Sequence, residues 1–164
     1  MKKTKQEAQN YEWVNITQDA AYAPRDGAGA LVFKDKMWLL GGWNQLDKEN
    51  FPRNCNNEVW SSTDGAIWTL EKPNSYRGTA FRNFPDWEWR HTAGYVVYKD
   101  RMWIIGGDII QGHYQNDVWN SADGKKWEQI TWKVPWKDRA LHHTLVFKDK
   151  IWVMGGQTTP AFAP

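Results

Sequence analysis

The sequence has little cysteine, little net charge and no long apolar run, and each shortage excludes a class of protein. The single cysteine, Cys55, forms no intrachain disulfide framework and leaves no cysteine cluster for a structural zinc site. A net charge of +2, with the basic residues dispersed, offers no footprint for nucleic acid. No run approaches the length of a membrane span, and no apolar signal segment follows the start MKKTKQEAQN. These shortages predict a cytoplasmic protein that binds neither nucleic acid nor membrane.

Tryptophan, in contrast, is abundant, with 13 residues in a chain of 164. Its indole ring combines a large apolar surface with one N–H group that needs a partner, so it is common in packed cores and on ligand-binding surfaces. The overall composition, 41% hydrophobic and 24% charged, is that of an ordinary globular domain. The question is therefore which tryptophans belong to the core and which to a binding surface.

A repeated segment answers part of this question. The stretch MWLLGG at residues 37–42 returns as MWIIGG at 102–107 and as IWVMGG at 151–156. An arginine stands 16 residues before the first glycine of every copy. The arginines are Arg25, Arg90 and Arg139, and the glycine pairs are Gly41 and Gly42, Gly106 and Gly107, and Gly155 and Gly156. Such constant spacing predicts repeated structural units.

Each unit predicts two hairpins. An apolar run, a Lys-Asp turn and the tryptophan-containing run form the first hairpin. The segments 57–68 and 116–127 form the second, with a turn at Asp-Gly where glycine adopts a positive φ angle. The first two strands do not alternate apolar with polar residues, so we expect both of their faces to be buried between neighbouring sheets. The last strand is more polar and is expected to be outermost.

Four antiparallel strands of this kind predict one blade of a β-propeller. Arg90 and Arg139 are 49 residues apart, and a kelch blade has about 50 residues. The Arg-x-x-His at 139–142, the paired glycines and the Asn-Asp-Val-Trp at 116–119 followed by Trp127 resemble kelch repeats of bacterial galactose-oxidase-like proteins. The Ser-x-Asp-Gly-x-x-Trp hairpins are also similar to the Asp-box of sialidase propellers, but they lack one residue of that box, so this stays a minor alternative.

The predicted fold is all-β: an incomplete kelch-type β-propeller of about two and a half four-stranded antiparallel blades plus an N-terminal outer strand. We expect a disordered tail at 1–10 and a partial propeller at 11–164, with the outer strand at 12–17, blade one at 25–72, blade two at 90–131 and partial blade three at 139–157. Because propellers close with roughly four to eight blades, we expect the remaining blades in a longer chain. A second copy that completes the ring is the less favoured alternative.

The repeat also separates scaffold from surface. Trp60, Trp119, Trp68 and Trp127 recur at equivalent positions and are expected in the core, and the repeated arginines are expected to pair with backbone or carboxylates. Glu58 and Asp117 are interpreted as acceptors that anchor loops, His142 as a core histidine, and Cys55 as an ordinary loop thiol.

The loops that differ in length between units all lie at one end of the blades, and this end is the predicted binding face. Its candidate ligand-binding residues are Trp43, Asn44, Arg53, Asn54, Tyr76, Arg77, Arg82, Trp89, His113, Tyr114 and Trp132. Their flat apolar surfaces and planar donors suit sugars or a peptide with acidic groups.

The predicted function is therefore recognition of a carbohydrate or a protein or peptide ligand. The resemblance implies an alternative, namely part of a carbohydrate-active enzyme related to galactose oxidase or to a kelch-type sialic-acid epimerase, with catalytic residues partly outside this chain. Galactose oxidase uses copper with two tyrosines, two histidines and a Tyr–Cys crosslink, a set that this sequence does not locate. His91 and His143 lack a third ligand, so neither a metal nor a cofactor is predicted.

Overall fold

The computed structural model describes residues 11–48, 51, 54–75, 86–110 and 113–158. The described residues form antiparallel β-sheets and no helix, which confirms the all-β prediction and its four-stranded sheets. Consequently, the described chain contains no helix with the length and apolar character needed to cross a membrane.

Two four-stranded sheets are followed along the described chain by a two-stranded third sheet and a further short strand pair. The first sheet contains β1 (Gly29–Phe33), β2 (Lys36–Trp43), β3 (Cys55–Ser62) and β4 (Thr69–Lys72) in that order. The second sheet repeats the order with β5 (Gly94–Tyr98), β6 (Arg101–Asp108), β7 (Tyr114–Ser121) and β8 (Glu128–Thr131). The third sheet is the hairpin of β10 (His143–Phe147) and β11 (Lys150–Met154), beside which β9 (Arg139–Ala140) pairs with β12 (Gln157–Thr158).

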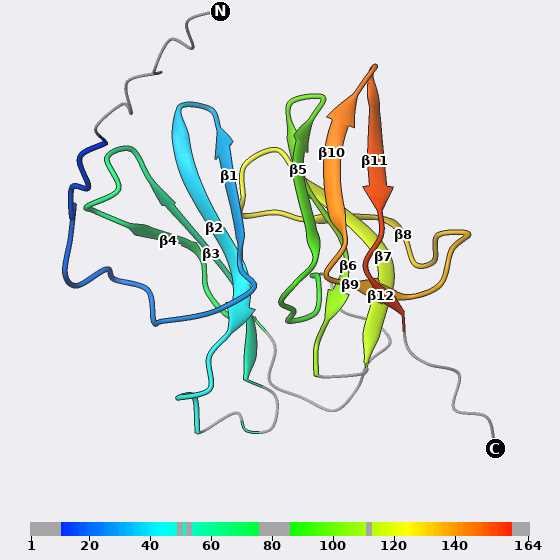
Figure 1. The fold of residues 1–164 in the computed structure, drawn as a ribbon, viewed down its shortest axis with the longest axis horizontal. Helices are drawn as coiled ribbons and strands as arrows, with labels where there is room; N and C mark the ends of the chain where they lie inside the picture. The colour runs from blue at the N-terminus through cyan, green and yellow to red at the C-terminus, as the bar shows by residue number, and fades with distance from the viewer. Residues whose placement is uncertain (1–10, 49–50, 52–53, 76–85, 111–112, 159–164) are drawn as a thin grey trace, which may run out of the picture.

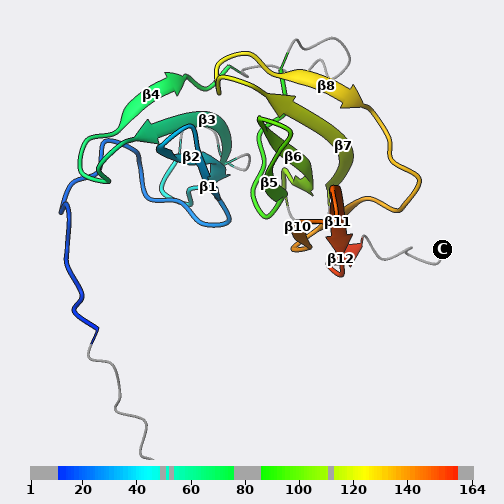
Figure 2. The same ribbon diagram turned by 90° about the horizontal axis from the view of Figure 1, so that it is seen from above.

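The sheets stack side by side and fan apart. In Figure 1 the strands β1, β5 and β10 lie at the front of successive sheets. Seen from above, these first strands converge on the inner side of an arc, whereas β4 and β8 lie on its outer side (Figure 2). This arrangement is compatible with consecutive blades of a β-propeller.

Local sequence explains the first hairpin of each sheet. The two turn residues, Lys34 and Asp35 in the first sheet, have φ angles of 49° and 56°. Positive φ at both central residues is the geometry of a type I′ turn, whose twist matches that of the strands. The same Lys-Asp pair forms the turn in the second and third sheets, so the three hairpins share one register.

The main core lies between the first and second sheets. Phe33, Trp38 and Leu40 from the first sheet are buried against Met102 and Ile104 from the second, and each is at most 5% exposed. Fully burying a side chain of this size contributes roughly 1.5–3 kcal/mol. β6 buries residues on both faces, so its sequence shows no alternation. β2 is buried toward the second sheet, but Met37 on its other face is 37% exposed, so the expectation that both faces are buried is wrong for the first sheet.

The repeated arginines have the scaffold role that the sequence predicts. In each unit the Nη1 atom donates to the carbonyl oxygen of the glycine 16 residues later, at 3.2 Å for Arg25, 2.9 Å for Arg90 and 2.7 Å for Arg139. This bond fixes the chain that enters a sheet against the end of that sheet's second strand.

The predicted outer strand at 12–17 is wrong for this chain on its own. Residues 11–17 form no strand, and Trp13 is 97% exposed. Trp13 stands 12 residues before Arg25, as Trp127 does before Arg139, so the repeat predicts a core position for it. A β-strand needs a neighbour to satisfy its backbone N–H and C=O groups. Within the described residues no strand pairs with this segment.

Candidate binding pocket

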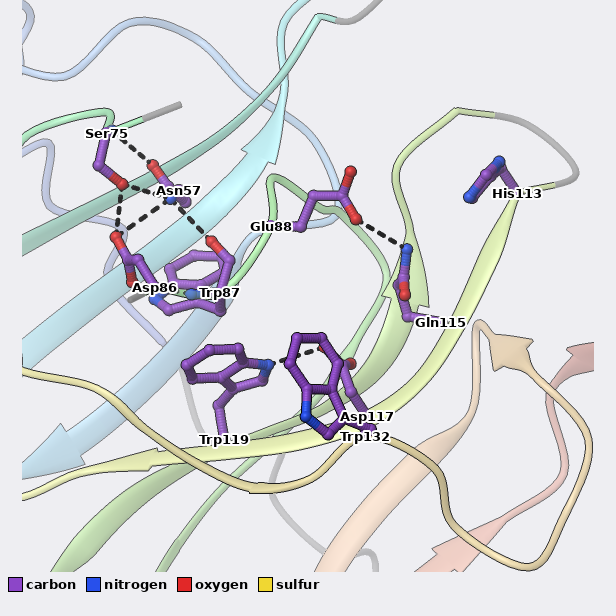
Figure 3. Close-up of a pocket in the computed structure, with 10 residues that line it drawn as sticks. All are labelled: Asn57, Ser75, Asp86, Trp87, Glu88, His113, Gln115, Asp117, Trp119 and Trp132. Carbon is purple, nitrogen blue, oxygen red and sulfur yellow. Dashed lines mark hydrogen bonds between the residues drawn. The ribbon is translucent and has the colours of Figure 1, made fainter. Parts of the chain in front are cut away.

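A pocket of about 330 Å³ lies between the first and second sheets, at the end of the molecule where the long loops join the strands. This is the predicted face, but the pocket opens between the third strands, β3 and β7, and not beside the converging first strands. Its size is at the lower end of the range for small-molecule sites, about 300–1,000 Å³. It is lined by Asn57, Ser75, Asp86, Trp87, Glu88, His113, Gln115, Asp117, Trp119 and Trp132 (Figure 3).

Asn57, at the start of β3, organises one corner of the pocket. Its side-chain amide donates to the backbone oxygen of Trp87 at 2.8 Å and to Ser75 Oγ at 2.9 Å, and its Oδ1 accepts from the backbone N–H of Ser75 at 3.0 Å. Asn57 is only 1% exposed. The buried Asn57 side chain therefore holds Ser75 and Trp87, from two separate segments, against β3.

Lys72 strengthens the same corner. Its Nζ lies 2.6 Å from the Asp86 carboxylate and donates to the backbone oxygen of Asn57 at 2.9 Å. Burial lowers the pKa of Lys72, and the nearby Asp86 charge opposes this effect without cancelling it. The Asp86 carboxylate is thus neutralised locally and serves as part of the pocket wall.

The opposite wall is built on the buried ion pair of Arg90 and Asp117. The guanidinium donates to both carboxylate oxygens, at 2.6 and 3.0 Å, and Trp119 Nε1 donates to the same carboxylate at 2.7 Å. Burial has the largest effect and lowers the pKa of Arg90, but the charge and hydrogen bonds of Asp117, together with Tyr95 and Glu88, outweigh it, so the pKa is raised. The pair holds the ring of Trp119 in a fixed orientation at the pocket.

Arg90 also joins the two sheets through its backbone. Its N–H donates to Asn56 O at 3.4 Å, and its carbonyl accepts from the Gly42 N–H at 2.9 Å, both in the first sheet. Its side chain meanwhile binds within the second sheet. The guanidinium therefore pairs inside its own unit and not between units as expected, and it is the backbone of Arg90 that holds the two pocket walls together.

Glu88 and Gln115 form a polar pair across from this corner. Gln115 Nε2 donates to Glu88 Oε2 at 3.1 Å, and both side chains are half-buried (Figure 3). They present planar groups that accept and donate hydrogen bonds side by side. A sugar hydroxyl, which is both a donor and an acceptor, matches such a pair.

Aromatic surface completes the pocket. Trp132, which follows β8, is 64% exposed, whereas Trp87 and Trp119 are buried at 0% and 4%. The indole of Trp132 therefore remains accessible while the other two form the pocket wall. The Nε1 of Trp87 has no hydrogen-bond acceptor among the described residues.

Most residues proposed from the sequence do not reach this pocket. His113 and Trp132 line it, but Asn54, Trp89 and Tyr114 are 3%, 4% and 7% exposed, so their expected exposure is wrong. Trp43 and Asn44 are half-buried and are not among the lining residues. The candidates Arg53, Tyr76, Arg77 and Arg82 lie outside the described residues.

Sequence reasoning missed the polar residues of the pocket because they stand beside repeat positions. The sequence interpretation treats Asp117 as an acceptor that anchors a loop and does not single out Asn57. Glu88 carried a usable signal, since the equivalent positions two residues before Arg25 and Arg139 are Ala23 and Lys137. The three units carry three different side chains at this position, which indicates that the scaffold does not require any one of them.

A second cluster lies between the first two sheets, around Cys55. The thiol is 3.3 Å from His91 Nδ1, which lies 2.9 Å from the backbone oxygen of Asp108. Cys55 is on β3 and 1% exposed, packed with Trp89 and beside Trp43, so it is a core thiol and not the loop thiol expected. Burial, followed by the Asp108 charge, raises its pKa to about 12. The thiol is therefore protonated and a poor nucleophile despite its histidine neighbour.

In the described structure, neither His142 nor a cluster of metal-binding side chains provides a second candidate site. His142 is buried as predicted, but neither ring nitrogen has a hydrogen-bond partner in the described part of the chain, and burial lowers its pKa to about 4. Over the same residues, no group of three or more His, Cys, Asp or Glu side chains is arranged to hold a metal ion.

Comparison with protein-family models finds no match, and a search of curated proteins finds no significant similarity.

Proposed function

We propose that this chain is a ligand-binding module of the kelch-type β-propeller class that recognises carbohydrate in the pocket between its first and second sheets. The observation that carries the proposal is the exposed Trp132 indole beside the Glu88–Gln115 pair in one preformed pocket. An aromatic face packs against the apolar face of a sugar ring, while planar side chains bind its hydroxyl groups.

The charges of the pocket select among the ligands suggested by the sequence. All three acidic lining residues are carboxylates, and Asp86 and Asp117 are already paired with Lys72 and Arg90. Of the described arginines and lysines, none lines the pocket. Such a wall opposes an acidic peptide by like-charge repulsion, but it accepts a neutral sugar. We therefore favour carbohydrate over the acidic peptide.

The hydrogen-bond network supports a rigid site. Asn57, Lys72 and the Arg90–Asp117 pair fix the walls before any ligand arrives. Rigid walls reduce the conformational entropy lost on binding. The same engagement leaves Asp86 and Asp117 committed to cationic partners, so we assign them binding and positioning roles and do not favour the enzymatic alternative.

A glycan array followed by calorimetry with the purified chain tests the proposal. Trp132→Ala is expected to weaken binding of any selected glycan at least about tenfold, consistent with a loss of roughly 1–3 kcal/mol at an aromatic contact. Phe51→Ala is the matched control, because it removes an exposed aromatic side chain that does not line the pocket.

The variant Glu88→Gln tests whether the pocket selects neutral ligands over anionic ones. It keeps the shape of the side chain but removes the charge, so binding of a neutral glycan should fall only a few-fold while repulsion of anionic ligands is relieved. Absence of any glycan ligand, or equal binding by the wild type and Trp132→Ala, refutes the proposal. Binding of a peptide that is lost in Trp132→Ala would instead assign the pocket to protein recognition.

A further inference from the structure

The third sheet has an open face that repeats a pattern buried elsewhere in the chain. By strand register, His143 pairs with Met154 and Leu145 with Trp152, which places these residues on one face together with Phe147. The four large apolar residues of this face are 41–53% exposed. Their equivalents in the first sheet are Leu31, Phe33, Trp38 and Leu40, which the second sheet covers. The open face therefore has the composition of an interface between sheets.

The first sheet has the complementary open face on its other side. Val32 and Met37, which pair across β1 and β2, are 73% and 37% exposed. In the second sheet the equivalent of Met37 is Met102, which is fully buried against the first sheet. The described chain thus carries both halves of the same type of interface, one at each end of the stack.

Among the described residues, charged side chains at the hairpin turns also pair between neighbouring sheets and leave one charge without an ion pair at each end of the stack. Lys34 of the first sheet lies 3.8 Å from Asp100 of the second, and Lys99 of the second lies 3.7 Å from Asp149 of the third. Each turn lysine therefore pairs with the turn aspartate of the following sheet. The series leaves Lys148 on the third sheet and Asp35 on the first, and these opposite charges stand beside the two open faces.

The sizes of facing residues are also complementary. A Cβ atom at Gly29 would overlap the ring of Tyr95, and one at Gly94 would overlap Thr144 Oγ1, so each sheet approaches its neighbour over a glycine. At the equivalent position the open face of the third sheet carries His143. The residue that would face it on the first sheet is Ala30, at the position of Tyr95 and Thr144. A large residue on one open face therefore meets a small one on the other.

Aromatic pairs supply a third match. The ring of Tyr22 lies 5.1 Å from Trp68, and the ring of Trp87 lies 5.7 Å from Trp127, in both cases edge to face. At the third equivalent position Trp136 is 36% exposed and lines an open groove. Trp13 stands 12 residues before Arg25, as Trp127 does before Arg139, and it is 97% exposed. Trp13 is thus the counterpart that Trp136 lacks.

We propose that the open face of the third sheet binds the open face of the first sheet of a second copy, and that the N-terminal segment of that copy brings Trp13 against Trp136. Two such junctions, related by a twofold axis, close the pair into a ring. A second copy is the occupant because the charge, size and aromatic partners that the open face needs are all found on this chain. The proposal does not depend on what the pocket binds.

Analytical ultracentrifugation of the purified chain measures the predicted association. The wild type should sediment as a dimer, and Leu145→Asp or Val32→Asp should each weaken dimerisation at least about 30-fold, because each places a charge in the apolar interface. Ile130→Asp is the matched control, since Ile130 is 51% exposed on β8 and belongs to neither open face. Melting curves of the variants check that all three remain folded.

Site-specific crosslinking tests which surfaces meet. The Asp35→Cys and Lys148→Cys variants are mixed and treated with a short bismaleimide. In each variant the native Cys55 thiol is buried, so only the introduced thiol is accessible to the reagent. Crosslinked dimers should form in the mixture and not with either variant alone, because the junction joins residue 35 to residue 148. Ile130→Cys mixed with Lys148→Cys is the matched control and should not crosslink.

Each other outcome overturns the proposal. A monomer at all concentrations shows that a different occupant, such as a further segment of the natural protein, covers the open face. An open-ended series of larger species shows that copies stack without closing. Dimers that crosslink equally well through Ile130→Cys show an interface elsewhere on the molecule.

Discussion

The three repeat arginines provide a direct test of how much burial determines the energy of an ion pair. Arg25, Arg90 and Arg139 occupy the same position in their units and each donates to an equivalent glycine carbonyl. The carboxylate partners of Arg25 and Arg90 differ in burial, and Arg139 has no carboxylate partner among the described residues. Replacing each by methionine removes the guanidinium but keeps much of the apolar stem.

The Arg90→Met variant is expected to lose most. The Arg90 side chain is 0% exposed and that of Asp117 is 9% exposed. Removing the cation strands a buried carboxylate, which costs about 3–5 kcal/mol, although the Trp119 N–H still donates to it. The free energy of unfolding should therefore fall by about that amount, which is a large part of the stability of an ordinary domain.

Its two counterparts should lose progressively less. Arg25 is 3% exposed but its partner Glu58 is 26% exposed, so water can solvate the stranded carboxylate, and we expect a loss of about 1–3 kcal/mol. Arg139 has no ion pair among the described residues and donates to Gly155 O at an exposed site, so its loss should stay below about 1 kcal/mol.

Urea denaturation followed by tryptophan fluorescence measures the three losses from the same chain. The double variant Arg90→Met with Asp117→Asn should recover part of the loss, because no buried charge remains. Equal losses at all three positions would refute the reasoning, since the shared glycine bond and not the carboxylate would then carry the energy. A smaller loss at Arg90 than at Arg25 would refute it as well.

Three further predictions concern single buried sites. Cys55 should resist alkylation at pH 8 in the native protein and react at once in urea, because burial raises its pKa to about 12; rapid native labelling would contradict the burial. Gly29→Ala should destabilise by about 1–3 kcal/mol through overlap with the ring of Tyr95, and Tyr95→Thr should relieve this in the double variant, as unfolding curves can show. The pKa of His142 is lowered to about 4 from an ordinary 6.5, mainly by burial. The unfolded chain therefore binds more protons between these pH values, and the free energy of unfolding should fall by at most about 3 kcal/mol as pH decreases from 6.5 to 4. His142→Gln should remove this part of the pH dependence, and an unchanged profile would place the titration elsewhere.

Local signals in the sequence predict the strands and turns well. The Lys-Asp turns, the Asp-Gly turns and the Arg-to-glycine spacing each depend on residues close in the chain or on a repeated geometry. The predicted outer strand at 12–17 is absent because it depends on a partner strand and not on local residues. A strand is stabilised by its neighbour, and no described strand lies beside this segment, so its own residues cannot determine its conformation.

The pocket could be predicted only in part, because it depends on how two sheets meet. Trp89 and Trp132 both lie in segments that join one unit to the next, yet Trp89 is buried with Cys55 while Trp132 is exposed. Loop length therefore indicates the end of the molecule at which the pocket lies, but not which tryptophans face solvent. That distinction arises from packing between segments far apart in the sequence, which a single sequence does not display.

The position of the pocket follows from the way in which one unit departs from the others. A regular stack would form the same cleft between the second and third sheets as between the first and second. There, however, Lys137 stands at the position of Glu88, and Trp136 is exposed beside it where Trp87 is buried. The third sheet also has no third or fourth strand among the described residues, so Gln115, Asp117 and Trp119 have no counterparts there and the site is not repeated. Under the proposed function, we therefore expect one carbohydrate at the junction of the first and second sheets.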